Sequence, residues 1–155
     1  MAQLFVYTHN SAVRFAVNSL VEDKDDVIFF DNRLQFLVCA TILKNANLLI
    51  DALHGNHDDI RWLYPKLKLR GIESNVHYLV PSRIVSNSYM KDFSLITDIL
   101  GLKTICRSAG KRKSTFSTGN LRCLILKALS ERMSDAELEF ILTLYDRMSN
   151  TYKDL

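Results

Sequence analysis

The chain has 155 residues, a length that suits one domain or one domain with a short appendage. Its hydrophobic content of 48%, its charged content of 24% and its net charge of +3 are ordinary for a soluble globular protein and indicate no particular partner. The longest apolar run, residues 36–43, is too short to span a bilayer, and the first residues lack the pattern of a secretory signal. We therefore expect a cytoplasmic protein without membrane contact.

Three cysteines lie far apart among apolar residues: Cys39, Cys106 and Cys123. An odd number with this spacing argues against a disulfide framework and against a metal site. We expect reduced thiols packed in the interior, and no bound metal or cofactor.

Five runs rich in β-branched and large apolar residues are bounded by turn residues, and each is predicted to form a strand. The predicted strands cover residues 3–8, 26–30, 46–53, 76–80 and 103–107. The run at 46–53 is apolar on both faces, which is typical of a strand buried within a parallel sheet.

Apolar residues recur with helical spacing between and after these runs. The predicted helices cover residues 13–21, 33–44, 58–71, 93–101 and 121–129. Residues 9–11 offer caps for the first helix. Gly71 and Gly101 are expected to end two others, and Pro65 is expected to kink or shorten the third helix, because an interior proline removes a hydrogen bond.

The alternation of strands and helices predicts a doubly wound α/β fold, in which helices cover both faces of a parallel sheet. In such sheets, binding and catalytic side chains lie at the carboxyl ends of the strands. Polar residues that follow the predicted strands are therefore candidates for a site, and Asp51 lies at the end of the third strand.

A further helix is indicated after residue 133. Ser134 and Glu137 have the spacing of a capping box, in which each side chain accepts a hydrogen bond from the backbone amide of the other residue. The apolar residues that follow share one helical face: Leu138, Ile141, Leu142, Tyr145 and Met148. This stripe needs a surface to pack against, in this chain or in a partner.

Three segments resemble a known family. Residues 8–14, Thr-His-Asn-Ser-Ala-Val-Arg, look like the segment Asp-Asp-His-Pro-x-Val-Arg that begins many response regulators with a LuxR-type helix-turn-helix. Residues 47–53, Asn-Leu-Leu-Ile-Asp-Ala-Leu, resemble the phospho-acceptor strand Asp-Leu-Val-Leu-x-Asp-Leu of their receiver domains. Residues 133–150 are similar to the start of the LuxR-type DNA-binding domain, which opens Leu-Ser/Thr-x-x-Glu-x-x-Val-Leu and continues to a Ser-Asn.

The resemblance implies a flavodoxin/CheY-like (βα)5 sheet with strand order 2-1-3-4-5, followed by one carboxyl-terminal helix. It divides the chain into a receiver-like domain at residues 1–132 and the first helix of a truncated helix-turn-helix segment at residues 133–155. The family places its recognition helix beyond the Ser-Asn, past the last residue of this sequence. Direct entry into a DNA major groove is therefore not expected.

The residues that receivers use for phosphorylation are replaced in this chain. Thr8 and His9 stand where an active receiver has the carboxylates that hold Mg²⁺, a cation that prefers oxygen ligands. The acceptor position falls on Ala52, and Asp51 lies one residue early. Because successive side chains of a strand point to opposite faces, Asp51 is not expected to be a nucleophile.

The later strands lack the other groups of a receiver. The switch hydroxyl is expected near Val80, with Ser82 two residues later, and Arg107 replaces the lysine that follows the fifth strand. We therefore interpret seven residues as a vestigial phosphorylation pocket: Thr8, His9, Asp51, Ala52, Val80, Ser82 and Arg107.

The resemblance and these departures together predict a non-enzymatic transcription regulator, a pseudo-receiver that acts through protein–protein contacts. Its partner would be a second copy or a full-length LuxR-type regulator, and the dimer face of the family maps onto about residues 90–130. DNA would be reached only indirectly or through a missing carboxyl-terminal part. Two alternatives stay open: a receiver phosphorylated on Asp51 with shifted geometry, and a small-ligand sensor that uses the vestigial pocket.

A basic loop is a further candidate for a contact. Residues 108–118 contain Lys111, Arg112 and Lys113, close to Arg107. These cations could contact phosphate, nucleic acid or a protein partner. Basic loops of this length are more often only solvated, so a role in binding nucleic acid is the weaker interpretation.

Overall fold

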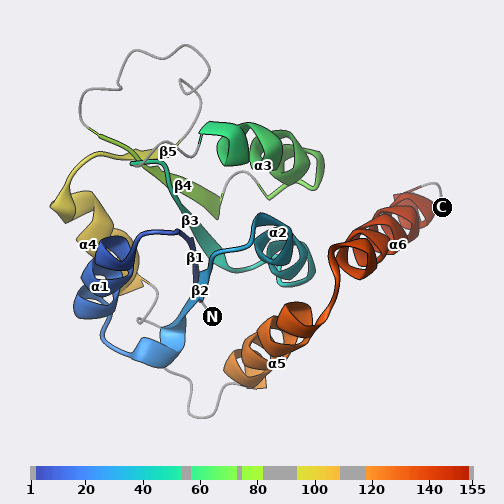
Figure 1. The fold of residues 1–155 in the computed structure, drawn as a ribbon, viewed down its shortest axis with the longest axis horizontal. Coiled ribbons are helices and arrows are strands. Elements are labelled where there is room, and N and C mark those ends of the chain that lie inside the picture. The colour runs from blue at the N-terminus through green and yellow to red at the C-terminus, as the bar shows by residue number, and fades with distance from the viewer. Residues whose placement is uncertain (1–2, 54–56, 73–74, 82–93, 109–117, 154–155) are drawn as a thin grey trace.

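The computed structural model describes residues 3–53, 57–72, 75–81, 94–108 and 118–153 (Figure 1). Five parallel strands form one sheet in the order β2-β1-β3-β4-β5. The strands are β1 Leu4–Tyr7, β2 Val27–Phe30, β3 Asn47–Asp51, β4 Val76–Leu79 and β5 Ser94–Ile96. The predicted α/β fold of flavodoxin/CheY type, with strand order 2-1-3-4-5, is confirmed.

The side chains of β1 point alternately to the two faces of the sheet, and both faces are covered. Phe5 and Tyr7 pack into one core, whereas Leu4 and Val6 pack into the other. All four side chains are buried. This is the expected environment of a central strand in a parallel sheet.

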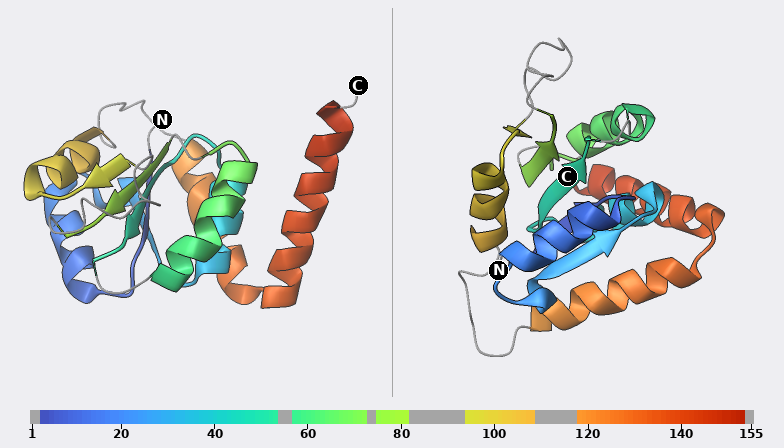
Figure 2. Two further views of the ribbon diagram at one scale, coloured as in Figure 1. Left: turned by 90° about the horizontal axis from the view of Figure 1, so that it is seen from above. Right: turned by 60° about the vertical axis from the view of Figure 1, so that its left-hand side comes forward.

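Four helices cover the sheet, two on each face. α1 Ser11–Leu20 and α4 Ile99–Ser108 pack on one face, and α2 Arg33–Ile42 and α3 His57–Leu69 pack on the other (Figures 1 and 2). A short 3-10 helix, Lys24–Asp26, leads into β2.

Two further helices, α5 Thr118–Arg132 and α6 Asp135–Lys153, both pack on α2: α5 lies beside it, next to β2, and α6 lies on its outer side (Figures 1 and 2). α2 is thus covered by the sheet and by both of these helices, and for this reason seven of its ten residues are buried. Cys123 of α5 and Leu138 and Leu142 of α6 belong to the same core as Phe5. α6 thus packs into the α/β body, whereas its assignment to a separate helix-turn-helix segment stays a prediction.

Side-chain caps begin three of the helices. Asn10 Oδ1 accepts a hydrogen bond from the amide two residues later (2.8 Å), and Asn32 Oδ1 does the same (2.9 Å). The predicted capping box is confirmed, because the Ser134 amide donates to Glu137 Oε2 (3.1 Å) and the Glu137 amide donates to Ser134 Oγ (3.3 Å).

α3 is continuous across Pro65, so the prediction that this proline shortens the helix is wrong. Leu63 and Leu67 lie on either side of Pro65 and are buried in the core. Packing of this kind outweighs the loss of one hydrogen bond. Gly71 ends the helix as predicted: it has a φ of 70°, and its amide and that of Ile72 bond the carbonyls of the last turn.

The predicted fourth helix and fifth strand are wrong. Residues 94–96, which were expected to be helical, form β5, and residues 103–107, which were expected to form a strand, lie within α4. Leu102 and Cys106 are one helical turn apart and are the buried residues of α4. The apolar residues that suggested a strand at 103–107 therefore belong to the inner face of a helix. β5 has only three residues, which is too short to show a clear alternation of apolar and polar side chains.

Gly101 does not end a helix but lies in the first turn of α4. Its amide donates a hydrogen bond to Asp98 Oδ1 (2.8 Å). A Cβ at this position would lie 3.1 Å from Ile96 Cγ2. Glycine here therefore permits the close approach of α4 to the end of β5.

The three cysteines are free and buried, which confirms the predicted packing of the thiols. Burial raises the pKa of Cys39 to about 12 and the pKa of Cys106 to about 11. Among the described helices, none combines the length and the hydropathy of a membrane span.

The packing of α6 can be tested by shortening one core side chain. Leu138→Ala is expected to lower the free energy of unfolding by about 2–5 kcal/mol, because Leu138 is fully buried and alanine leaves a cavity. Leu100→Ala, at a side chain that is 69% exposed, is the matched control and should cost less than about 1 kcal/mol. Urea unfolding followed by circular dichroism measures both values. Equal losses would contradict the position of α6 in the core.

Candidate functional site

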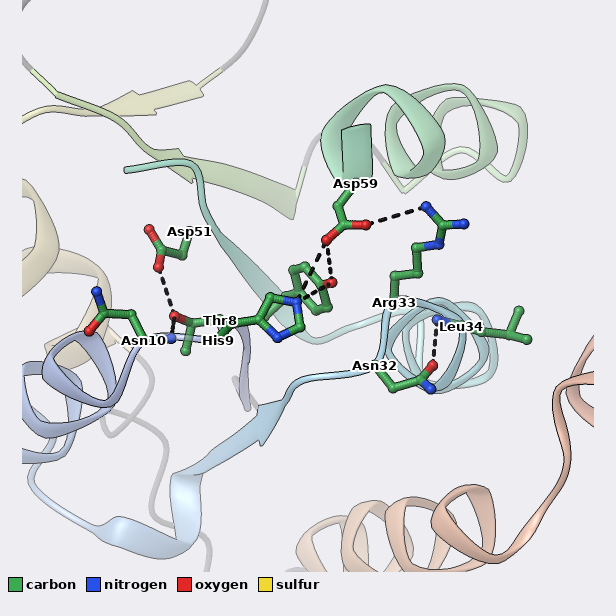
Figure 3. Close-up of polar contacts among 9 residues, drawn as sticks. Thr8, His9, Asn10, Asn32, Arg33, Leu34, Asp51 and Asp59 are labelled. Carbon is green, nitrogen blue, oxygen red and sulfur yellow. Dashed lines mark hydrogen bonds and ion pairs between the residues drawn. The ribbon is translucent and has the colours of Figure 1, made fainter. Parts of the chain in front are cut away.

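The carboxyl ends of β1 and β3 bring Thr8 and Asp51 together at one edge of the sheet (Figure 3). Asp51 is the last residue of β3. Thr8 continues β1, since its amide donates to the carbonyl of Phe30 at 3.0 Å. Both side chains are buried, with 0% and 1% of their residue surface exposed. A carboxylate at such a depth needs hydrogen-bond donors from the protein.

Asp51 receives those donors from the two loops beside it. Thr8 Oγ1 donates to Asp51 Oδ2 at 2.7 Å, and the amide of Leu53 donates to Asp51 Oδ1 at 2.9 Å. The Thr8 hydroxyl in turn accepts from the amide of Asn10 at 3.0 Å. Both carboxylate oxygens are therefore engaged within the protein, and the carboxylate acts as a link between the β1 and β3 loops.

Asp51 and Ala52 lie on opposite faces of the sheet. Leu49, which has the same orientation as Asp51, packs in the core below α1 and α4, whereas Ala52 packs in the core below α2 and α3. Ala52 is 3% exposed, so the position aligned with the phospho-acceptor carries a buried methyl group. Because Asp51 is offset by one residue from the acceptor position, its side chain thus points to the opposite face of the sheet.

A second polar cluster lies on the α2 and α3 side of the same edge. Tyr7 Oη donates to Asp59 Oδ2 at 2.6 Å, and His9 Nε2 lies 3.0 Å from Tyr7 Oη and 3.7 Å from Asp59 Oδ2. Arg33 Nη1 donates to Asp59 Oδ1 at 3.3 Å (Figure 3). Burial and the hydrogen bond to Asp59 raise the pKa of Tyr7 above its usual range, so the phenol stays protonated as a donor.

This cluster forms one wall of an open polar cavity of about 320 Å³. The guanidinium of Arg33 lies over the ring of Trp62, with its central carbon 4.5 Å from the ring centroid. The start of α6 contributes Asp135 and Glu139 to the lining. The cavity offers ion pairing and hydrogen bonding, as the contacts of Asp59 with Arg33 and Tyr7 show. The described residues include no group of three His, Cys, Asp or Glu placed to hold a metal ion.

The sequence identified Thr8, His9 and Asp51 but did not identify Tyr7, Arg33 or Asp59 as site residues. Asp59 lies in the first turn of α3, and Tyr7 lies 52 residues away from it along the chain. The signal that could have found Arg33 is its position: it begins α2, separated from the end of β2 by two residues, at the edge of the sheet where binding residues gather.

Val80 follows β4 and is buried. It borders a second cavity of about 360 Å³ between α1 and α4, which is lined mainly by apolar residues that include Ala12, Leu53 and Leu102. An aliphatic side chain at this position provides no hydroxyl to a bound phosphoryl group. Ser82, the other candidate for the switch hydroxyl, lies outside the described residues.

Arg107 does not belong to the predicted pocket. It lies in the last turn of α4, which begins at the carboxyl edge of the sheet and runs back toward the opposite edge. The residues that directly follow β5 are Thr97 and Asp98, neither of which is a cation. Lys111, Arg112 and Lys113 lie outside the described residues.

Comparison of the chain with protein-family models, curated proteins and solved structures finds no match. The fold is known from the strand order of the sheet, but a fold alone does not define a function. Function has to be inferred from the site geometry.

The link between Thr8 and Asp51 can be tested by removing one oxygen. Thr8→Val is expected to lower the free energy of unfolding by about 2–3 kcal/mol, because it leaves a buried carboxylate oxygen without its donor. Thr8→Ser keeps the hydroxyl, loses one methyl group and should cost about 1 kcal/mol. Chemical unfolding measures both values. If valine were tolerated as well as serine, the hydrogen bond would have no structural role.

Proposed function

We propose that this chain is a non-enzymatic, receiver-like protein that takes part in transcription regulation through protein–protein contacts and without phosphorylation. The receiver sheet order and the resemblance of residues 8–14, 47–53 and 133–150 to LuxR-type regulators support the regulatory part of this proposal. A cytoplasmic location belongs to the same proposal, and contact with DNA would be indirect or through a carboxyl-terminal part outside this sequence.

The single observation that carries the proposal is the engagement of Asp51. An aspartate that accepts a phosphoryl group must present an oxygen to a reagent from solvent, beside a cation that offsets the added charge. Asp51 is 1% exposed, and its oxygens accept hydrogen bonds from Thr8 and Leu53. The neighbouring Thr8 and His9 contribute no carboxylate for Mg²⁺. This geometry favours a structural role for Asp51.

The two alternatives make different demands. Phosphorylation of Asp51 would require the Thr8 hydroxyl and the Leu53 amide to be displaced from the carboxylate. A small-ligand sensor would use the apolar cavity of about 360 Å³ beside Val80, and stabilisation by a metabolite in the absence of Mg²⁺ would favour it.

Acetyl phosphate with Mg²⁺ tests the proposal against phosphorylation. The intact mass of the protein is expected to stay unchanged, and beryllofluoride with Mg²⁺ is expected to leave the melting temperature unchanged, since no anion is bound. Asp51→Asn is the matched control, because it removes the candidate nucleophile, the last residue of β3, and keeps the size of the side chain. A mass gain of one phosphate that is absent from Asp51→Asn would overturn the proposal.

A further inference from the structure

The apolar face of α5 points away from the protein. Leu121, Leu124, Ile125 and Leu129 recur with helical spacing and are 60%, 49%, 50% and 53% exposed. The buried residues of this helix, by contrast, include Cys123 and Ser130, which face α2. The four regularly spaced apolar residues of α5 therefore lie on its outer side and do not pack in the core of this chain.

α6 also carries an outer apolar stripe. Its inner face packs through Leu138 and Leu142, whereas Phe140, Leu144 and Met148 are 66%, 48% and 55% exposed. These three residues are spaced by four, so they form one row along the helix. α6 is therefore apolar on two sides, and one of them is turned outward.

More than half of the exposed large hydrophobic residues that the structure describes belong to the two outer stripes, since seven of the twelve lie on α5 and α6. Monomeric proteins rarely expose contiguous apolar patches larger than a few hundred Å², and such patches mark interaction sites. With their polar rims, the outer faces of two helices are comparable in size to the roughly 800 Å² per partner of a standard specific interface.

The exposed charges of the two helices differ in balance. α5 exposes Arg122 and Arg132 beside a single acidic residue, Glu131, which pairs with Lys127 of the same helix. The first turns of α6 expose Asp135, Glu137 and Glu139, and its exposed base, Arg147, lies further along the helix. A contact of α5 with α5 would bring like charges together, but a contact of α5 with α6 of another copy pairs basic with acidic side chains. In an arrangement with twofold symmetry this contact forms twice, which doubles the buried area.

The two helices can present both stripes to one partner. They diverge from the turn at residues 133–134, and α2 occupies the space on their inner side (Figure 2). The inner side is thus filled by this chain, and the outer sides are open to a second molecule. The face suggested by the resemblance, at about residues 90–130, is divided in the structure, because α4 and α5 lie on opposite sides of the sheet.

We propose that the chain forms a homodimer in which α5 of each copy packs on α6 of the other through these outer stripes. This inference rests on the proposed function, since it names the protein partner as a second copy of the chain. It does not depend on whether Asp51 is phosphorylated. A monomer in the dimer test would therefore leave the conclusion about phosphorylation unchanged, and phosphorylation of Asp51 would leave the conclusion about the dimer unchanged.

Light scattering coupled to size-exclusion chromatography tests the homodimer with the full chain. At about 100 µM, well above the micromolar Kd of weak specific interfaces, twice the monomer mass is expected. Leu124→Glu on α5 and Leu144→Glu on α6 are each expected to raise the dimer Kd at least ~100-fold, because they bury an unpaired charge. Leu100→Glu, at a leucine of α4 that is 69% exposed, is the control with the same substitution outside the stripes and should remain dimeric.

Circular dichroism and thermal melting show whether each variant is folded; if a glutamate variant is not, glutamine at the same position replaces it in the comparison. A wild-type monomer at this concentration would overturn the proposal. A dimer that survives either the α5 or the α6 substitution would overturn the pairing of α5 with α6. Loss of the dimer in Leu100→Glu with retention in Leu124→Glu would move the interface to α4.

Discussion

The hydrogen bond from Thr8 to Asp51 determines what the carboxyl edge of the sheet can do. A carboxylate at the end of a central strand is buried by the helices on both sides, and it is stable there only with donors close to it. Thr8 and the amide of Leu53 supply these donors. The loops that follow β1 and β3 are held together as a result. The polar groups at this edge that are accessible to solvent are instead His9 and Asp59, which lie on the α2 side.

The burial of α2 has a comparable effect on the outer surface. A helix that is apolar on most of its circumference cannot be covered by the sheet alone, and α5 and α6 complete its environment. The ion pair of Arg70 with Asp146, at 2.8 Å, and the ammonium of Lys44 over the ring of Tyr145 fix α6 to the residues that directly follow α3 and α2. α5 and α6, the two helices that cover α2, also carry the exposed apolar stripes, which form the surface proposed for the partner.

Local signals in the sequence predicted the first four strands, the cap of α1 within residues 9–11, the capping box at Ser134 and the end of α3 at Gly71, because each depends on a few neighbouring residues. β5 was missed because three residues carry too little pattern. The contact of Tyr7 with Asp59 joins residues 52 positions apart, and no local signal encodes it. The helical spacing of apolar residues correctly predicted α5. Such spacing shows that a helix has an apolar face, but it does not show which part of the protein covers that face.

A structural role for Asp51 requires that its carboxylate does not react with phosphoryl groups, and the amide of Leu53 reports on the carboxylate directly through its hydrogen bond to Oδ1. The most direct measurement is a nitrogen-15 NMR titration of the labelled protein with Mg²⁺ and beryllofluoride, followed at the amides of Leu53 and Asn10. Both resonances are expected to keep their chemical shifts. A saturable shift of the Leu53 amide would contradict the structural role of Asp51.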